Sequence, residues 1–443
     1  MDIVIIGGGI GGLTLALSLH LRGIPCRVYE SAPEVKELGV GITLLPHGMR
    51  ELTALGLGEA LATQGIENRD SCFFNRFGHL IYAEPCGRAA GYPVPEVGIH
   101  RGRLHLTLWR AAMERLGAAS VLTDHQCIGL DQNTRDVTLY FRSTATGATR
   151  ASVTADIVIA CDGVNSAVRR QFYPGEELCF GGINTWRGVT RAKPFLTGRS
   201  YVRIGSIQSG NLVIYPIVDD VDGQGQQLIN WTAQVAQPGY ERNDWNKPGR
   251  LEDFLPIFAG WTFDWLDVPD LLRRSDVIFE YPMVDREPVD RWTFGRVTLL
   301  GDAAHPMYPR GSNGAAQAIL DARTLADCLA AGGNPLVALS AYEAVRSGPT
   351  ARVVRTNREH PPDYLIRRVE ELVGDAPFDD LDRYITRAEL QRLSDKYKRI
   401  TGFAPEQLAG LPRHGRTHQL GRTPMDTRFA GLSSAAAPRR KKE

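Results

Sequence analysis

The sequence predicts an α/β fold: a doubly wound, Rossmann-type domain interrupted by an antiparallel β-sheet domain and followed by C-terminal helices. Three observations carry this prediction. The chain begins with an apolar strand, a glycine-rich turn and a helix, and the strand-into-turn pattern returns at 155–170 and 296–330. Between these two segments lie aromatic-rich, alternating stretches typical of antiparallel strands, such as YVRIGSI, NLVIYPIV and LINWTAQV.

Composition narrows the class of protein. The chain has 443 residues, of which 43% are hydrophobic, which is long enough for two domains. Its net charge of +1 gives no overall electrostatic attraction to nucleic acid. No run of about 18 apolar residues occurs, so no membrane span is expected, and the strand at the start leaves no room for a secretory leader. Seven scattered cysteines without a C-x-x-C pair indicate reduced thiols in a cytoplasmic protein, and no histidine spacing indicates a metal site.

The first turn has the features of a dinucleotide site. Residues 3–6 are wholly apolar, and Gly7, Gly9 and Gly12 form G-x-G-x-x-G before a helix that extends to about Arg22. These glycines allow a tight turn, close approach of a pyrophosphate and close packing of helix on strand. A second strand is expected at 25–30, where Glu30 can accept hydrogen bonds from an adenosine ribose. The turn by itself fits NAD and FAD equally well. The alternative to a dinucleotide site is a glycine-rich turn that binds no ligand.

Two later segments place polar groups at strand ends. In ADIVIACDGVNSAVRR a buried strand leads into D-G-x-x-S-x-V-R, which can also be read as a helix cap by Asn165 or Ser166. In RVTLLGDAAHPMYPRGSNGAAQAILDA, Asp302 follows a strand at 297–300, and a proline-stiffened loop precedes a helix at 315–331. Carboxyl ends of parallel strands and helix N-termini are where α/β sheets bind ligands and stabilise negative charge.

The three segments, in this order, resemble the single-component (group A) FAD-dependent aromatic monooxygenases, the para-hydroxybenzoate hydroxylase group. The segment GDAAHPMYPRGSNGAAQAILDA is most similar to the sequences of the branch that contains the phenazine-carboxylate monooxygenase of pyocyanin biosynthesis. The stretches at 37–57, 100–109 and 358–363 add to a resemblance that covers roughly residues 1–370. It is specific for the family and says little about the substrate.

The resemblance implies a set of FAD-binding residues, each matched by position. The adenosine diphosphate part would be held by Gly7, Gly9, Gly12 and Glu30, and the phosphate and ribityl parts by Arg101 and Asp302. Asp162 resembles the D-G aspartate that the family links to the use of both FAD and NADPH. The flavin ring would lie along Val40 and Gly41 and take backbone N–H groups from Gly311, Ser312, Asn313 and Gly314. Pro309 and Tyr308 would lie at the reactive edge of the ring as catalytic residues.

The substrate side is less constrained. Candidate walls of a substrate site are Trp186, Arg187, Tyr215 and Met307, and ordinary sheet packing is the alternative for each of them. Arg310 stands where the family commonly has a small or apolar residue, and it could face solvent, NADPH or a substrate anion. His47 and His305 are as easily structural as catalytic.

The expected domain organisation is discontinuous. An FAD-binding domain is predicted at 1–71, 98–179 and 285–337, and a substrate-binding β domain at 72–97 and 180–284. Helices are expected over 338–410, including one that begins with the capping box Thr386–Glu389. Residues 411–443 read as a disordered basic tail, for which a nucleic-acid-binding arm is the less favoured alternative.

The activity that the resemblance implies is hydroxylation of an aromatic or heteroaromatic small molecule, with or without decarboxylation, through a flavin C4a-hydroperoxide. FAD, NADPH or NADH, and O2 are the implied cofactor and co-substrates. A cytoplasmic monomer or homodimer of secondary metabolism, with no nucleic-acid partner, is expected. The alternatives are another FAD-dependent oxidoreductase, such as an oxidase or reductase, and a non-catalytic FAD-binding protein. The halogenase motif W-x-W-x-I-P does not occur.

Overall fold

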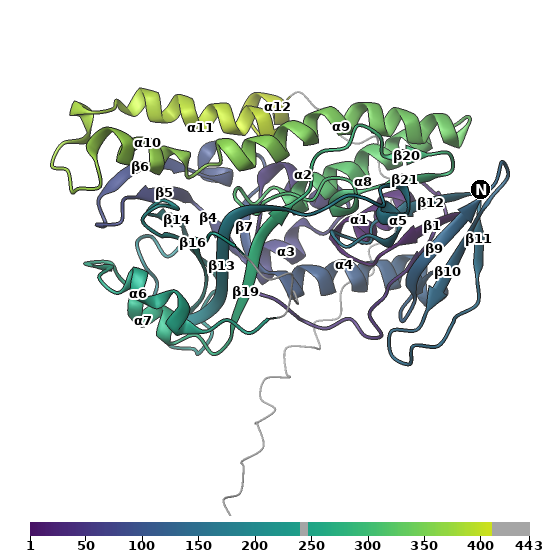
Figure 1. Ribbon diagram of the computed structural model, residues 1–443, viewed down its shortest axis with the longest axis horizontal. Helices are drawn as coiled ribbons and strands as arrows, with labels where there is room; N and C mark the ends of the chain where they lie inside the picture. Colours follow the sequence, from purple (N-terminus) through teal and green to yellow (C-terminus); the bar gives the residue numbers. More distant parts are fainter. Residues whose placement is uncertain (240–246, 410–443) are drawn as a thin grey trace, which may run out of the picture. The chain divides into compact units, whose positions relative to one another are not determined.

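The computed structural model describes residues 1–239 and 247–409. The predicted basic tail at 411–443 lies outside these ranges. Within them, helices and strands form two large sheets, three small sheets and a set of C-terminal helices (Figure 1). No described helix has the length and apolar character needed to cross a membrane.

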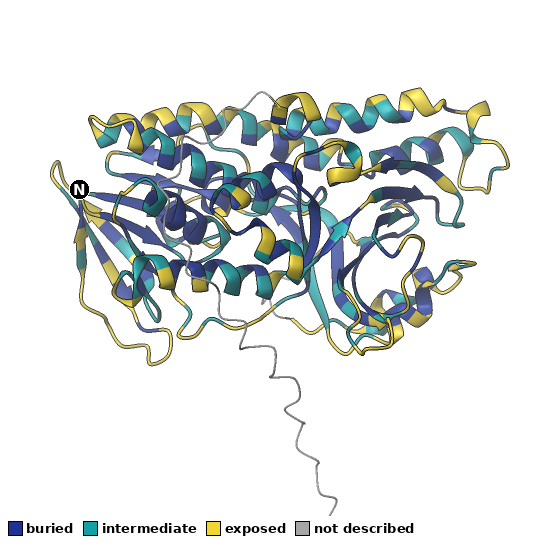
Figure 2. Cartoon of the chain, turned by 180° about the vertical axis from the view of Figure 1, so that it is seen from behind, coloured by how far each residue is buried: buried dark blue, intermediate teal, exposed yellow. Residues whose placement is uncertain are grey.

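A six-stranded sheet carries the predicted Rossmann-type pattern. Its strands pair in the order β20-β21-β12-β1-β2-β8, and all the pairs are parallel except β20 with β21. The bounds are β20 Thr293–Phe294, β21 Val297–Leu299, β12 Ile157–Ala160, β1 Ile3–Ile6, β2 Arg27–Tyr29 and β8 Val121–Leu122. β2 is shorter than the predicted 25–30, and Glu30 follows it directly. Figure 2 shows strands of this region dark blue, as expected for apolar strands covered by helices.

Helices follow these strands as the sequence predicts. α1 (Ile10–Leu21) packs against α4 (Arg101–Leu116) and α8 (Gly314–Ala330), and α5 (Ala167–Phe172) follows β12. α1 begins at Ile10, with Gly9 of the glycine-rich turn as its N-cap, and ends one residue before the predicted Arg22. The doubly wound domain is therefore confirmed.

A seven-stranded sheet forms the second part of the predicted fold. Its order is β19-β13-β16-β15-β14-β5-β6, antiparallel except where β14 pairs with β5. The bounds are β19 Ile278–Asp285, β13 Cys179–Ala192, β16 Gln227–Ala236, β15 Asn211–Val218, β14 Ser200–Ile204, β5 Asp70–Phe74 and β6 Leu80–Pro85. The interrupting antiparallel sheet is confirmed, while the exact domain boundaries stay a prediction.

Three small sheets accompany the two large ones. One has the order β3-β7-β4, with bounds Gly41–Leu44, Glu96–His100 and Ile66–Asn68, and it contacts β15 of the seven-stranded sheet. The others are β9 Gln126–Gln132, β10 Val137–Arg142 and β11 Val153–Ala155, and the pair β17 Thr262–Phe263 with β18 Leu266–Asp267. The remaining short helices here are α2 Pro46–Ala54, α3 Gly58–Gln64, α6 Leu255–Phe258 and α7 Val268–Arg273.

The C-terminal helices pack on both parts. They are α9 Pro335–Glu359, α10 Tyr364–Val373, α11 Arg387–Thr401 and α12 Pro405–Ala409. α9 contacts α8 and α11, and α10 packs Leu365, Ile366 and Val369 against apolar side chains of β5 and β6. The predicted capping box is present, since Thr386 and Glu389 satisfy each other's backbone N–H groups.

Candidate active site

The glycine-rich turn is packed so closely that two of its glycines have no room for a side chain. Gly7 has φ +100, and a Cβ there would lie 2.4 Å from the carbonyl oxygen of Cys161. A Cβ on Gly12 would lie 2.0 Å from the carbonyl oxygen of Gly7. At Gly9, by contrast, no described atom lies within 4 Å of an added Cβ. The turn is therefore tight against β12 and open at Gly9, in front of the N-terminus of α1.

Glu30 is held by backbone groups at the end of β2. Its carboxylate accepts from the N–H of Gly8 at 2.6 Å and the N–H of Ala32 at 2.7 Å. It also accepts from the Ser31 hydroxyl at 3.0 Å. Two charge-assisted bonds to backbone N–H groups place the carboxylate next to the glycine-rich turn, where a ribose could donate to it.

Asp162 lies beside this turn with one carboxylate oxygen that has no partner among the described residues. Asp162 accepts from the N–H of Ala167 at 2.8 Å through Oδ2, while its buried Oδ1 has no partner among the described residues. Burial raises the pKa of the Asp162 carboxyl. Asp302 follows β21 and Arg101 begins α4, and both are exposed. Polar groups left open in this way suit a polar ligand.

The loop after Asp302 is anchored through buried polar contacts. Asp321 on α8 accepts from Arg346 Nε at 2.6 Å and from the N–H of Gly301 at 3.1 Å, and it pairs with His305. Burial alone would raise the pKa of Asp321, but His305 and Arg346 outweigh it and lower that pKa to about 2. His305 thus holds the loop onto α8.

Arg169, in the second motif, ties β12 to the same loop. It donates to the carbonyl oxygens of Ala303 at 3.0 Å and Ala304 at 2.6 Å, and it pairs with Glu176. Its neighbour Ser166 accepts from the N–H of Arg169 at 2.9 Å, so the helix cap foreseen as an alternative is present. Arg169 therefore joins two segments of the predicted site.

Residues 308–313 are held by the C-terminal helices. Asn313 donates to the hydroxyl of Tyr397 at 2.9 Å, and this hydroxyl donates to Asn357 at 2.8 Å. Asn357 in turn donates to the carbonyl oxygen of Tyr308 at 3.3 Å. Ser312 has φ +56 and lies 3.3 Å from the Tyr201 hydroxyl. The contacts from α9 and α11 support an uncommon backbone shape next to the N-terminus of α8.

Arg310, which departs from the family pattern, is paired with Asp363 at the start of α10. Both side chains are largely buried, with 12% and 9% exposed. The ion pair links the loop to α10.

His47 begins α2 in a fully buried position and stacks on Phe403, with ring centroids 5.3 Å apart and an interplanar angle of 8°. Burial, reinforced by the charges of Arg346 and Arg50, lowers the pKa of His47 to about 3. The ring is therefore neutral in the folded protein at neutral pH, which suits packing rather than proton transfer.

This lowered pKa predicts acid sensitivity. Unfolding restores an ordinary pKa near 6.5, so stability from His47 is complete above that pH and falls as the pH drops toward 3, by at most about 1.4 kcal/mol per pH unit. Urea unfolding between pH 7 and pH 4.5 measures it. His47→Gln is expected to lose less stability over this range than the parent. Equal slopes for the two proteins would contradict the prediction.

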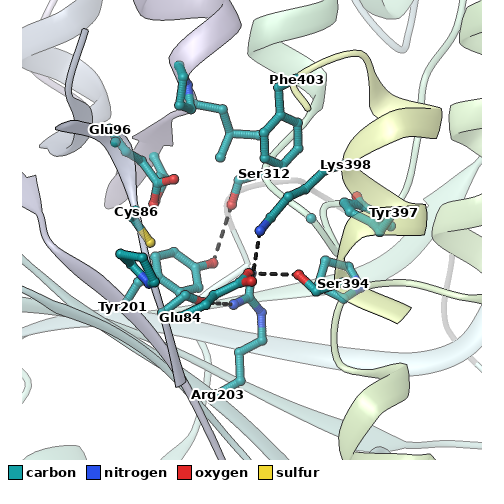
Figure 3. Close-up of a pocket in the computed structure, with 18 of the residues that line it drawn as sticks. Glu84, Cys86, Glu96, Tyr201, Arg203, Ser312, Ser394, Tyr397, Lys398 and Phe403 are labelled. Carbon is teal, nitrogen blue, oxygen red and sulfur yellow. Dashed lines mark hydrogen bonds and ion pairs between the residues drawn. The ribbon is translucent and has the colours of Figure 1, made fainter. Parts of the chain in front are cut away.

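A cavity adjoins Gly311 and Ser312 (Figure 3). We name it the main cavity; the empty space in it and in front of its mouth is about 660 Å³, open solvent included. Its walls come from β3, β5, β6, β7, β14 and α11, and they include Thr43, Phe73, Glu96, Arg203, Ser312, Lys398 and Phe403. The seven-stranded sheet, the small sheet β3-β7-β4 and a C-terminal helix thus meet around one space.

Arg203 is the cation of this cavity without an acidic partner. Its guanidinium carbon lies 4.4 Å from the ring centroid of Tyr201 and 5.0 Å from that of Phe73. It donates to the Ser71 hydroxyl at 2.9 Å, and no carboxylate among the described residues pairs with it. Lys398 differs, since it donates to Glu84 at 2.7 Å, and Glu84 also accepts from Ser394 at 2.7 Å.

The four predicted wall residues lie outside the lining of the main cavity. Trp186 stacks on Phe254 at 5.0 Å in the apolar cluster that also holds Trp231, and Met307 packs with Val353 and Val354. Tyr215 stacks on Tyr201 at 4.9 Å, one layer behind the cavity. Arg187 is half-buried, with its guanidinium carbon 5.8 Å from the ring centroid of Tyr281, and desolvation lowers its pKa. Sequence alternation does not say which sheet face meets the cavity.

Sequence reasoning missed Arg203, Glu96 and Asn230. Asn230 of β16 accepts from the N–H of Gly41 at 2.7 Å, so it joins the seven-stranded sheet to β3. Each of the three interrupts or begins a mostly buried strand. A polar side chain within such a strand is the signal that could have indicated them.

Comparison with known proteins identifies the family. A model described as an FAD binding domain matches residues 1–241 and 267–357. The chain belongs to this family. The chain is 46% identical to phenazine 1,6-dicarboxylic acid hydroxylase PhzS of Lysobacter antibioticus over 363 residues; this alignment covers 81% of this chain and 89% of the relative. It is 34% identical to 3-amino-4-hydroxybenzoate 2-monooxygenase PtmB3 of Streptomyces platensis, covering 90% and 96%.

Solved structures of other proteins share the fold of this chain. Klebsiella pneumoniae HpxO, in complex with FAD and uric acid, matches with a TM-score of 0.71 at 24% identity, over 92% of this chain and 97% of that one. A salicylate hydroxylase substrate complex matches with a TM-score of 0.69 at 22% identity, over 94% and 99%. The predicted fold and the predicted class, FAD-dependent aromatic monooxygenase, are confirmed.

The residues present fit FAD. The open space at Gly9, the unpartnered Oδ1 of Asp162 and the exposed Asp302 and Arg101 leave room and polar groups for a dinucleotide. The individual roles assigned to these residues, to Glu30, Val40 and Gly41 and to residues 308–314 all stay predictions.

Asp302→Ala is expected to weaken FAD binding about tenfold, because a hydrogen bond to a charged group is worth about 1.5 kcal/mol or more. Titration of apoprotein with FAD, followed by quenching of flavin fluorescence, measures the Kd. Asp264→Ala, which removes an exposed acid between β17 and β18, is the matched control. The same Kd for Asp302→Ala as for the parent would contradict the role.

Proposed function

We propose that this chain is an NAD(P)H- and O2-dependent FAD monooxygenase that hydroxylates an anionic aromatic or heteroaromatic small molecule in the main cavity. We place it in the reducing cytoplasm, as a monomer or homodimer, where its seven cysteines remain the free thiols that the structure contains. When bound, FAD would accept hydride from NAD(P)H and activate O2.

The unpaired charge of Arg203 is the observation that carries this proposal. A guanidinium between two aromatic rings, with no carboxylate partner among the described residues, is a ready partner for a substrate carboxylate. The rings of Phe73 and Tyr201 would also flank an aromatic ligand. Because the other cation, Lys398, is already paired with Glu84, Arg203 is the stronger candidate for anchoring an anion.

The position of the cavity supports hydroxylation. It adjoins Gly311 and Ser312, the residues expected beside the flavin ring, and Tyr92, Phe403 and Leu365 close other parts of it with apolar surface. Such walls orient a flat ring and exclude water, which keeps activated oxygen for the substrate.

Relatives support an acidic ring as substrate. Their names specify phenazine 1,6-dicarboxylic acid, 3-amino-4-hydroxybenzoate and 3-hydroxybenzoate, all of which bear carboxyl groups. Decarboxylation accompanies hydroxylation when oxygen enters at the carbon that bears the carboxyl group.

The test is oxidation of NADPH and of NADH by the FAD-loaded protein across aromatic and heteroaromatic acids, with peroxide measured in parallel. One acid that stimulates oxidation strongly with little peroxide supports a coupled hydroxylase. Electrons that end as peroxide with every acid would instead support an oxidase on the same scaffold.

A further inference from the structure

Glu96 is a buried carboxyl group in the wall of the main cavity with one protein partner. It is the first residue of β7, and the antiparallel register sets it opposite Asn68, the last residue of β4. Asn68 Nδ2 donates to Glu96 Oε1 at 3.1 Å, and the Glu96 side chain is only 7% exposed. Figure 3 shows Glu96 on the other side of the cavity from Lys398 and Ser394. Its second oxygen, Oε2, has no hydrogen-bond partner among the described residues.

The groups around Glu96 favour its neutral form. Burial raises the pKa of Glu96, and Glu84 adds to this effect, while Asn68, Arg203 and Lys398 oppose it without reversing it. Neither cation pairs with Glu96, since Lys398 is bound to Glu84 and Arg203 donates to Ser71. The other titratable neighbours, Cys86 and Tyr92, have raised pKa values and are neutral at ordinary pH. A buried carboxyl group without a paired cation retains its proton more readily than one in water.

We propose that Glu96 donates a hydrogen bond into the main cavity, to a ring nitrogen of the substrate, and so selects N-heteroaromatic carboxylic acids. This rests on the proposed function, in which Arg203 takes the carboxylate. Oε1 of Glu96 is occupied by Asn68, so Oε2 is the oxygen that would carry the hydrogen when Glu96 is protonated. A carbocyclic ring of the same shape offers no acceptor and leaves the buried O–H without a partner.

The experiment compares two ligands that differ in the ring atoms alone. Phenazine-1-carboxylate and anthracene-1-carboxylate have the same shape and charge, but only the first has ring nitrogens. Their Kd values for the FAD-loaded protein are measured by calorimetry from pH 5.5 to pH 9. The phenazine acid is expected to bind at least about tenfold more tightly at low pH, and the difference is expected to shrink as the pH rises and Glu96 loses its proton.

Two variants distinguish a hydrogen-bond donor at Glu96 from other roles of this residue. Glu96→Gln keeps an acceptor for Asn68 and an N–H donor for the ligand, so it is expected to retain the preference and lose its pH dependence. Glu96→Leu is expected to bind both ligands within about threefold of each other. FAD content and thermal melting show that each variant is folded.

Several outcomes would overturn the role of Glu96 in ligand selection. Equal Kd values for the two acids in the parent, or a preference that survives in Glu96→Leu, overturn the role of Glu96 and leave the proposed function standing. Loss of the preference in Glu96→Gln also overturns it, because a proton acceptor rather than a donor would then be required. Failure of both acids to bind overturns the role of Glu96, and the NAD(P)H oxidation assay decides the proposed function separately.

Discussion

Gly12→Ala is expected to destabilise the protein by about 3 kcal/mol or more and to abolish FAD binding. The added Cβ would lie 2.0 Å from the carbonyl oxygen of Gly7 and 3.3 Å from Cys161 Cβ, and the first of these is backbone that cannot rotate away. Either α1 moves off β1 or the glycine-rich turn opens. Urea unfolding of the apoprotein and FAD titration measure the two effects.

Gly9→Ala is the matched control for this prediction. No described atom lies within 4 Å of a Cβ at Gly9, and its φ of −77 suits alanine. Its unfolding free energy should therefore stay within about 0.5 kcal/mol of the parent value, while FAD affinity falls because the methyl group occupies the space that a pyrophosphate needs. Unchanged FAD affinity in Gly9→Ala would show that the cofactor does not approach the turn there.

Arg203→Met is expected to raise the Kd for an aromatic carboxylate about 10- to 100-fold, since a charge-assisted hydrogen bond is worth about 1.5–3 kcal/mol. Methionine retains an unbranched stem between Phe73 and Tyr201, so packing is largely preserved. Titration of FAD-loaded protein with phenazine-1-carboxylate, followed by the flavin absorbance change, measures the Kd.

Neutral phenazine is the control ligand for Arg203→Met. Its Kd should change by less than about threefold, because it has no carboxylate to lose a partner. A parallel loss of affinity for the neutral and the anionic ligand would indicate damage to the cavity and contradict anchoring by charge.

The sequence predicted well those features that depend on neighbouring residues. The apolar run 3–6, the glycines after it and the helix start at Ile10 are local, as is the capping box of Thr386 with Glu389. The clash that excludes a side chain at Gly12 also lies within one short loop. Such features follow from backbone geometry over a few residues.

The lining of the main cavity could not be predicted in this way. Arg203 meets Ser71 across the parallel pairing of β14 with β5, and Glu96 meets Asn68 through the register of β7 with β4. A shift of one residue in either register would turn these side chains to the other face. Trp186 illustrates the same limit, because its position in a strand did not reveal that it packs on Phe254.

Tyr397, Lys398 and Ser394 all lie on α11, beyond residue 357, where the match to the family model ends. The cofactor loops therefore lie within the match to the family model, while one wall of the cavity lies outside it. The hydroxyl of Tyr397 nevertheless contacts Asn313 in the shared loop. An exchange of this helix between relatives would thus change one wall of the main cavity and, through the Tyr397 hydroxyl, the support of the loop expected to carry the flavin.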